Sequence, residues 1–165
     1  MDLFFRTFLP AAAEAGLAAP IMSRHLPIFR RCVAADDAAV LVARCIRPDA
    51  PVPGGHLLLL TSHRLVVTRQ SRVLRRLGLH LNTDLRHLSN VSWTPDPRLP
   101  VLEFTATAMD GIRERYLIRA GHCQPVPQLD ALLDHVFRGA GAPGPQAPPS
   151  PKEARRLTFS PAVAA

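Results

Sequence analysis

The stretch Leu57-Leu58-Leu59-Leu60-Thr61-Ser62-His63-Arg64-Leu65-Val66-Val67-Thr68 decides how the rest of the chain is interpreted. It holds two apolar runs, at 56–61 and 64–68, separated by polar residues. Short apolar runs rich in branched side chains and bounded by turn residues are typical of buried β-strands. The stretch therefore predicts two strands, with Thr61-Ser62 shaping the turn between them and Arg64 making polar contacts at its base.

Further strands are predicted on both sides of this pair. Apolar and polar residues alternate over 77–82, 101–108 and 112–119, and a less regular pattern becomes alternating as it approaches Trp93. A first strand is expected over 38–46. Asp110-Gly111 lies between two of these runs and is a strong hairpin-turn signal. Strands at such short intervals favour an antiparallel sheet or barrel over a βαβ fold.

Helices are predicted at both ends of this strand-rich region. The spacing of Val126, Leu129, Leu132, Leu133, Val136 and Phe137 predicts an amphipathic helix over 124–138, with Gly139 as its stop. The segment 2–17 favours a helix capped by Asp2 and kinked or broken at Pro10, and 23–32 a short helix capped by Ser23. Pro and Gly dominate after Gly139. We expect a helical extension (1–37), a folded domain (38–138) and a disordered Pro/Gly/Ala-rich tail (139–165).

The order of these elements resembles a bacterial pleckstrin-homology-like (PH-like) domain of the GRAM type over residues 38–138. The resemblance rests on Leu60, Thr61, Arg64 and Leu65, which match a Leu-Thr-x-x-Arg-Leu signature, and on Leu85-x-x-Leu88-x-x-Val91. It implies an α+β fold, in which a small, bent antiparallel β-barrel or sheet is closed by the C-terminal amphipathic helix. It also implies a binding module rather than an enzyme, without specifying the ligand.

Basic residues outnumber acidic ones, 20 to 13, which gives a formal net charge of +7. Arg69, Arg72, Arg75 and Arg76 surround a predicted hairpin tip at Gln70-Ser71. Guanidinium groups bind phosphate bidentately, so this cluster is the candidate anion-binding site. The alternative, a solvated hairpin without a ligand, stays open. No aromatic residue interrupts the cluster, which argues against a single-stranded nucleic acid as partner.

Catalytic and metal-binding patterns are missing from the sequence. The seven histidines show no zinc spacing, and His122-Cys123 are too close to share one ion. No nucleophile elbow, phosphate-binding glycine loop or dinucleotide fingerprint occurs. Cys32, Cys45 and Cys123 form no disulfide framework and are expected to be free thiols in a reducing compartment. We therefore expect no enzyme activity, no cofactor and no metal.

These observations lead to one expected function and two alternatives. We expect a non-catalytic binding or scaffold module that engages a protein partner. The alternatives are a peripheral module that binds anionic lipid head groups through the arginine hairpin, and a non-specific nucleic-acid binder.

The N-terminus lacks the basic region of a secretory signal, and no apolar run approaches the ~20 residues of a membrane span. A cytoplasmic location is predicted, with contact at the inner face of the membrane as an alternative. Phe4, Phe5 and Phe8 predict that the first helix packs on the sheet, or docks on a partner or a membrane interface.

Overall fold

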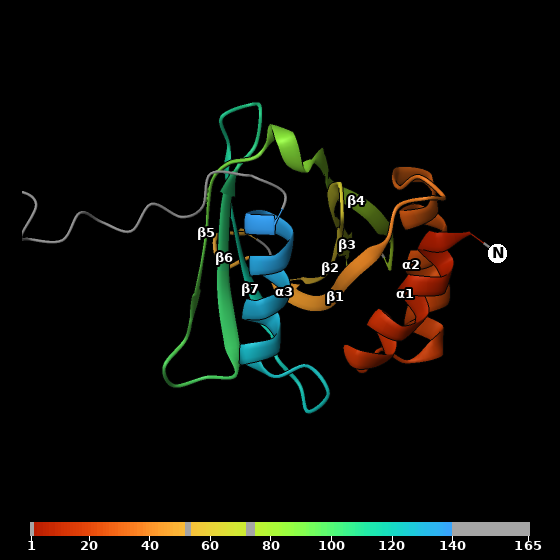
Figure 1. Cartoon of the computed structure of the whole chain (residues 1–165), viewed down its shortest axis with the longest axis horizontal. Helices are drawn as coiled ribbons and strands as arrows, with labels where there is room; N and C mark the ends of the chain where they lie inside the picture. The colour runs from red at the N-terminus through yellow and green to blue at the C-terminus, as the bar shows by residue number, and fades with distance from the viewer. Residues whose placement is uncertain (1, 52–53, 72–74, 140–165) are drawn as a thin grey trace, which may run out of the picture.

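The computed structural model describes residues 2–51, 54–71 and 75–139. Two helices precede seven strands, and a third helix follows them (Figure 1). The elements are α1 (Leu3–Glu14), α2 (Ala19–Cys32), β1 (Ala39–Ile46), β2 (Gly55–Thr61), β3 (Arg64–Gln70), β4 (Leu77–Asp84), a 3₁₀ turn η1 (Leu85–His87), β5 (Ser89–Pro95), β6 (Val101–Thr107), β7 (Arg113–Arg119) and α3 (Val126–Gly139). The chain thus has an α+β fold, and each predicted strand matches an observed one within a few residues.

The seven strands form one antiparallel sheet in the order β4-β3-β2-β1-β7-β6-β5. β4 and β5 are its edges, so among the described strands the sheet does not close, and the expected barrel is wrong on this point. The two halves of the sheet join only where Cys45 and Ile46 of β1 pair with Ile118 and Leu117 of β7. Because this junction is short, the halves diverge beyond it, and side chains rather than a strand ladder fill the space between them.

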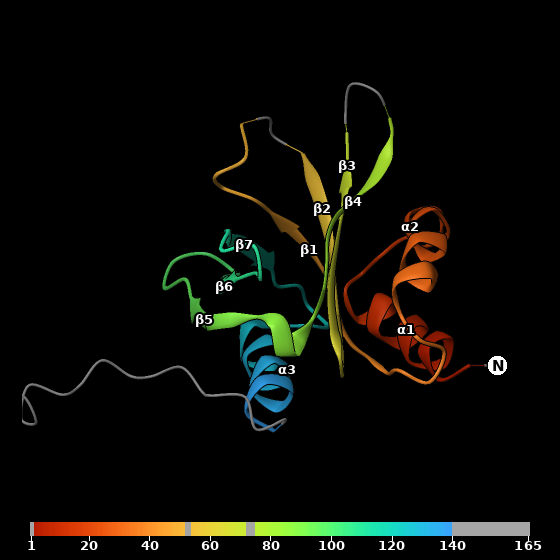
Figure 2. The ribbon, with the colours of Figure 1, turned by 90° about the horizontal axis from the view of Figure 1, so that it is seen from above.

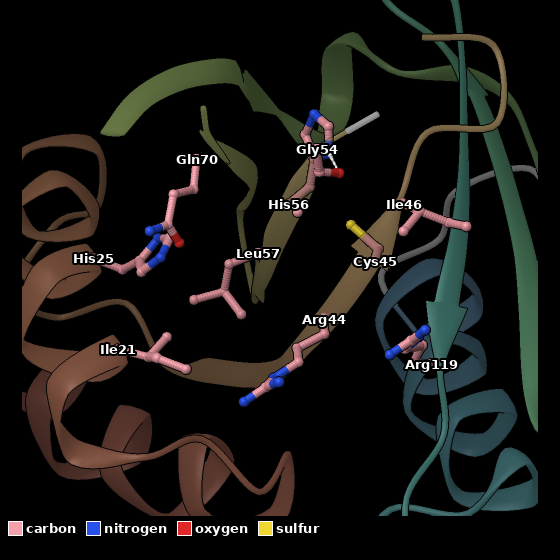
Figure 3. Close-up of a pocket in the computed structure, with 11 residues that line it drawn as sticks. Ile21, His25, Arg44, Cys45, Ile46, Gly54, His56, Leu57, Gln70 and Arg119 are labelled. Atoms are coloured by element: carbon pink, nitrogen blue, oxygen red, sulfur yellow. Dashed lines mark hydrogen bonds between the residues drawn. The ribbon is translucent and has the colours of Figure 1, made fainter. Parts of the chain in front are cut away.

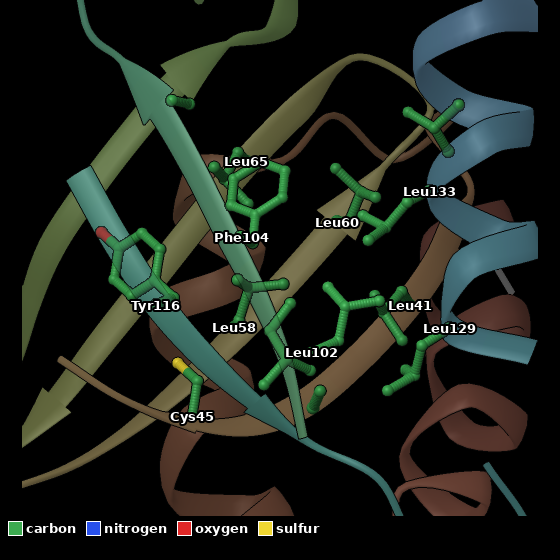
Figure 4. Packing of buried hydrophobic residues seen from close by; sticks show 14 of the residues in the cluster. Leu41, Cys45, Leu58, Leu60, Leu65, Leu102, Phe104, Tyr116, Leu129 and Leu133 are labelled. Atoms are coloured by element: carbon green, nitrogen blue, oxygen red, sulfur yellow. The ribbon is translucent and has the colours of Figure 1, made fainter. Parts of the chain in front are cut away.

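The β1–β4 half of the sheet carries a hydrophobic core on each face. Figure 2 shows this half between α1 and α2 on one side and β5–β7 with α3 on the other. The core that faces β5–β7 and α3 is called the inner core. Because side chains alternate along β2, Leu58 and Leu60 lie in this inner core, where Figure 4 shows them with Leu133 of α3. Leu57 and Leu59 lie in the second core, beneath α1 and α2, which is called the outer core. Burial on both faces explains why β2 is an almost unbroken apolar run.

The N-terminal helices differ from the sequence predictions in two respects. Asp2 caps α1, because its Oδ1 accepts from the Phe5 N–H at 2.7 Å, but Pro10 lies inside the helix and does not break it. Phe4 and Phe8 are buried in the outer core, and this packing outweighs the local cost of a helical proline. α2 begins at Ala19, so Ser23 is not its cap. The Ser23 hydroxyl donates to the Ala19 carbonyl at 3.0 Å inside the helix.

The C-terminal part of the fold follows the predictions closely. Gly111 has φ of 80° in the turn between β6 and β7, a conformation that glycine adopts without strain. α3 contacts β1, β5 and β6, and Leu129, Leu133, Val136 and Phe137 are buried in the inner core. Gly139 is the last residue of α3 rather than the first of the tail, and the predicted disorder of 140–165 lies outside the described residues. In the described part of the chain, no helix has the length and apolarity needed to span a membrane.

Candidate functional site

The structure separates the arginines that the sequence groups at the β3–β4 hairpin. Arg72 lies outside the described residues. Alternation along β3 places Thr68 and Gln70 on the α2 side of the sheet, and Arg69 on the opposite side. Arg75 lies on the α2 side, where it lines a hollow together with Gln70. Arg76 is exposed. The predicted cluster is therefore distributed over both faces of the hairpin.

A hollow of about 470 Å³ lies between α2 and the β3–β4 hairpin. We call it the hairpin hollow, and its lining residues are Arg24, Gly55, Gln70, Ser71 and Arg75. Arg24 comes from α2 and Arg75 from the hairpin, so residues 51 positions apart in the sequence line one site. None of the described residues that line it is acidic. The hollow thus presents two guanidinium groups to an incoming anion.

A second hollow of about 300 Å³ continues from the first, because both are lined by Gly55 and Gln70. It lies between α2 and the ends of β1, β2 and β7, and we call it the α2 groove (Figure 3). The side chains that line it include Ile21, His25, Arg44, Ile46, Leu57 and Arg119. In Figure 3, Leu57 projects between α2 and the strands, and Gln70 points toward His25. The groove therefore combines an apolar floor with arginines from two strands.

The arginines of both hollows have no protein partner in the described part of the chain. Ion pairs form at Arg30, Arg47, Arg86, Arg115 and Arg138, but none forms at Arg24, Arg44, Arg75 or Arg119. All four of these side chains are exposed, and the described lining of either hollow contains no aspartate or glutamate. Unneutralised cations of this kind attract anions more strongly than arginines already paired with carboxylates.

Two buried histidines border this region and are neutral at pH 7. His25 is 4% exposed, and its Nδ1 lies 2.7 Å from the Thr68 hydroxyl oxygen. Burial, and then the charge of Arg24, lower the pKa of His25 to about 4. Burial also lowers the pKa of His56 to about 4, and Arg69 is among the nearby cations that act in the same direction. The positive charge of the site therefore comes from its arginines.

The residues of the GRAM-type signature lie at the other end of β2 and β3. Leu60 and Leu65 are buried in the inner core. Thr61 is fully buried; its hydroxyl donates to Asp37 Oδ2 at 2.5 Å and accepts from the Arg64 N–H at 2.8 Å. The Arg64 guanidinium donates to Asn82 Oδ1 on the neighbouring strand β4. All four side chains thus contribute to the turn and the core, away from the two hollows.

A buried polar cluster crosses the space between the two halves of the sheet. Glu114 of β7 accepts from the Tyr116 hydroxyl at 3.0 Å, and it lies 3.2 Å from His80 and 3.6 Å from Arg47. His80 is the extra residue where the β3–β4 register shifts, and the shift directs its side chain toward β7. The His56 ring lies edge-on to His80, and its Nε2 has no hydrogen-bond partner among the described residues. This cluster links β4 to β7 without strand pairing.

Sequence reasoning identified Arg75 and the hairpin tip at Gln70-Ser71 but missed the other three arginines of the two hollows. Arg24, Arg44 and Arg119 belong to three different elements, and no local pattern relates them. One signal was present, since Arg44 interrupts an otherwise apolar first strand.

The three cysteines are free, and no group of three or more potential metal ligands occurs in the described ranges. The chain matches no family model, no curated protein and no solved structure.

Proposed function

We propose that the protein is a non-catalytic binding module of the PH-like type whose ligand carries phosphate groups. Two features of the fold support the PH-like assignment. Consecutive strands pair as antiparallel hairpins from β1 to β4 and from β5 to β7, β1 also pairs with β7, and the C-terminal helix α3 packs against β1, β5 and β6. Because the same fold serves many ligands, the nature of the ligand must be argued from the site itself.

The observation that carries the proposal is the hairpin hollow with its two unpaired arginines. Arg24 and Arg75 reach it from opposite walls, and no carboxylate competes for them among the described residues. A phosphate group between two guanidinium groups accepts several charge-assisted hydrogen bonds, which are stronger than those between neutral partners. It also removes the repulsion between the two cations. This ligand chemistry is that of an anionic lipid head group, so we place the module at the inner face of the membrane.

Vesicle co-sedimentation tests this function. The probes are phosphatidylcholine vesicles with and without phosphatidylserine, each at low and at physiological salt. We expect binding only to the anionic vesicles, weaker at the higher salt because the charges are screened. Replacing Arg24 and Arg75 with Gln should weaken this binding at least about ten-fold.

A matched control removes the same charge elsewhere. Arg6 on α1 and Arg98 between β5 and β6 are both exposed and line neither hollow. The double variant Arg6→Gln, Arg98→Gln should bind almost as well as the wild type. Equal losses in the two double variants would show adsorption through net charge alone. No binding by the wild type at low salt would refute the anionic ligand.

A protein partner is the second candidate function. Met109 is 74% exposed and Ile112 is 55% exposed, and they lie together at the tip of the β6–β7 hairpin. Exposed apolar side chains on a projecting turn are typical anchors for a protein interface. If the vesicle experiment fails, this hairpin tip is the surface to test next, through the variant Met109→Ser, Ile112→Ser.

A further inference from the structure

The α2 groove differs from the hairpin hollow in its apolar floor. Ile21 of α2 and Ile46 of β1 contribute to its lining, with Leu57 between α2 and the strands. Ile46, the last residue of β1, is 43% exposed. A volume of about 300 Å³ is at the lower end of the range for small-molecule pockets. The groove thus offers apolar contact to a ligand that the hairpin hollow alone does not.

The strand residues that line the groove have ladder partners in the sheet on at least one side. Arg44 pairs with Leu57 and Cys45 with His56 between β1 and β2. Gly55 pairs with Gln70 between β2 and β3, and Ile46 pairs with Leu117 of β7. Peptides that add to a sheet rely on free strand edges, and the two edge strands of this sheet, β4 and β5, contribute none of the described lining residues. Recognition in the groove therefore depends on apolar side chains and on guanidinium groups.

The distribution of charge specifies an anionic ligand with an apolar part. Arg44 and Arg119 line the groove, and Arg24 and Arg75 line the contiguous hairpin hollow. His25, which also lines the groove, is neutral at pH 7 because burial lowers its pKa. An apolar chain in the groove would contact Ile21, Ile46 and Leu57, while its charged end meets arginines in the groove or the hollow.

We propose that the α2 groove binds the alkyl chain of a monomeric single-chain anionic amphiphile, and that the arginines of the groove and the hairpin hollow hold its head group. The inference rests on the proposed function, since it assigns to the same site a ligand with a chain as well as an anionic head. It gives α2 a role in binding, because this helix forms one wall of the groove.

Calorimetric titration with three probes tests the inference on the full chain. Methyl phosphate carries the head group alone, decyl phosphate below its micelle concentration adds the chain, and decyl maltoside carries the chain without charge. We expect decyl phosphate to bind at least about 100-fold more tightly than methyl phosphate, and decyl maltoside to bind weakly. In a series from hexyl to decyl phosphate, each added methylene should tighten binding by about two- to four-fold while the groove has room.

A pair of variants locates the chain. Ile46→Thr removes apolar lining while keeping a β-branched residue in the strand, and should weaken decyl phosphate about ten-fold without changing methyl phosphate binding. Ile112→Thr replaces an isoleucine that is also exposed but lies outside the groove, and should leave both affinities unchanged. If Ile46→Thr fails to fold, the chain-length series on the wild type decides the question.

The remaining outcomes separate this inference from the proposed function. Equal affinities for methyl and decyl phosphate would overturn the chain site and leave the anionic function standing. Failure of both phosphates, and of anionic vesicles, would overturn both proposals. Equal binding of decyl maltoside and decyl phosphate would show apolar adsorption without recognition of charge. Binding to anionic vesicles but not to monomeric decyl phosphate would overturn the monomeric amphiphile in favour of a membrane surface.

Discussion

The burial of His25 makes a quantitative prediction for the pH dependence of stability. The imidazole is 4% exposed and contacts the Thr68 hydroxyl, so it remains neutral in the folded protein, with its pKa lowered to about 4. In the unfolded chain the same side chain titrates near its ordinary value of 6.5. The perturbation is a shift from pH 7 to pH 5, compared between the wild type and the variant His25→Asn. Asparagine retains an N–H donor near the position of Nδ1 but does not titrate.

The sign follows from which state binds the proton first. Above pH 6.5 both states are largely neutral at this position, so stability does not depend on it. As the pH falls below 6.5, the unfolded chain takes up a proton that the folded protein does not, and unfolding becomes more favourable until the pH reaches about 4. With pKa values of 6.5 and about 4, the loss between pH 7 and pH 5 is about 2 kcal/mol. His56, whose pKa is also lowered to about 4, adds a similar contribution.

The assay is urea unfolding at several pH values between 7 and 5, followed by circular dichroism. The wild type should lose roughly 4 kcal/mol over this range, and His25→Asn about half as much, whatever its stability at pH 7. His135→Asn, on the exposed face of α3, controls for the removal of a histidine as such. If His25→Asn shows the full pH dependence of the wild type, then His25 is not held neutral between α2 and β3, and the described packing of α2 is wrong.

Two further predictions concern the inner core and the turn after β2. Leu133→Ala should lower the free energy of unfolding by about 2–4 kcal/mol, because Leu133 is 1% exposed. Leu132→Ala should lower it by less, because Leu132 is only half-buried. Equal effects of the two variants in thermal or denaturant unfolding would contradict the orientation of α3. Thr61→Val should cost about 1–3 kcal/mol, because it leaves Asp37 and the Arg64 N–H without their hydroxyl partner; an unchanged midpoint in the same assay would show that these bonds contribute nothing.

Local patterns in the sequence predicted most of the secondary structure. The alternation over 112–119 and the turn residues Asp110-Gly111 both depend on neighbours within a few positions, and both were correct. The predictions failed where long-range packing outweighed local preference. Pro10 lies inside α1 because Phe4 and Phe8 are buried against the sheet, and α2 begins before Ser23. The barrel did not form because β1 and β7 share only a two-residue junction, and no local pattern reports how far two strands pair.

The candidate site shows the same division. The sequence predicted an arginine-rich hairpin, and Arg75 lines the hairpin hollow, while alternation along β3 carries Arg69 to the other face. The opposing Arg24 could not be predicted, because its position depends on where α2 packs. Arg44 was visible as a charge in an apolar strand, but the groove that it lines exists only once α2 lies across the sheet.

By itself, the sequence determined that this protein has seven strands, helices at both ends of the sheet and an excess of arginine. Periodicity, turn residues and composition act over a few residues, so they can be read along the chain. Tertiary structure alone decided that the sheet stays open, that α1 and α2 cover its outer face, and that unpaired arginines from three elements and the β3–β4 turn line two contiguous hollows. These features arise from contacts between residues far apart in the chain, where burial of apolar surface outweighs local preference.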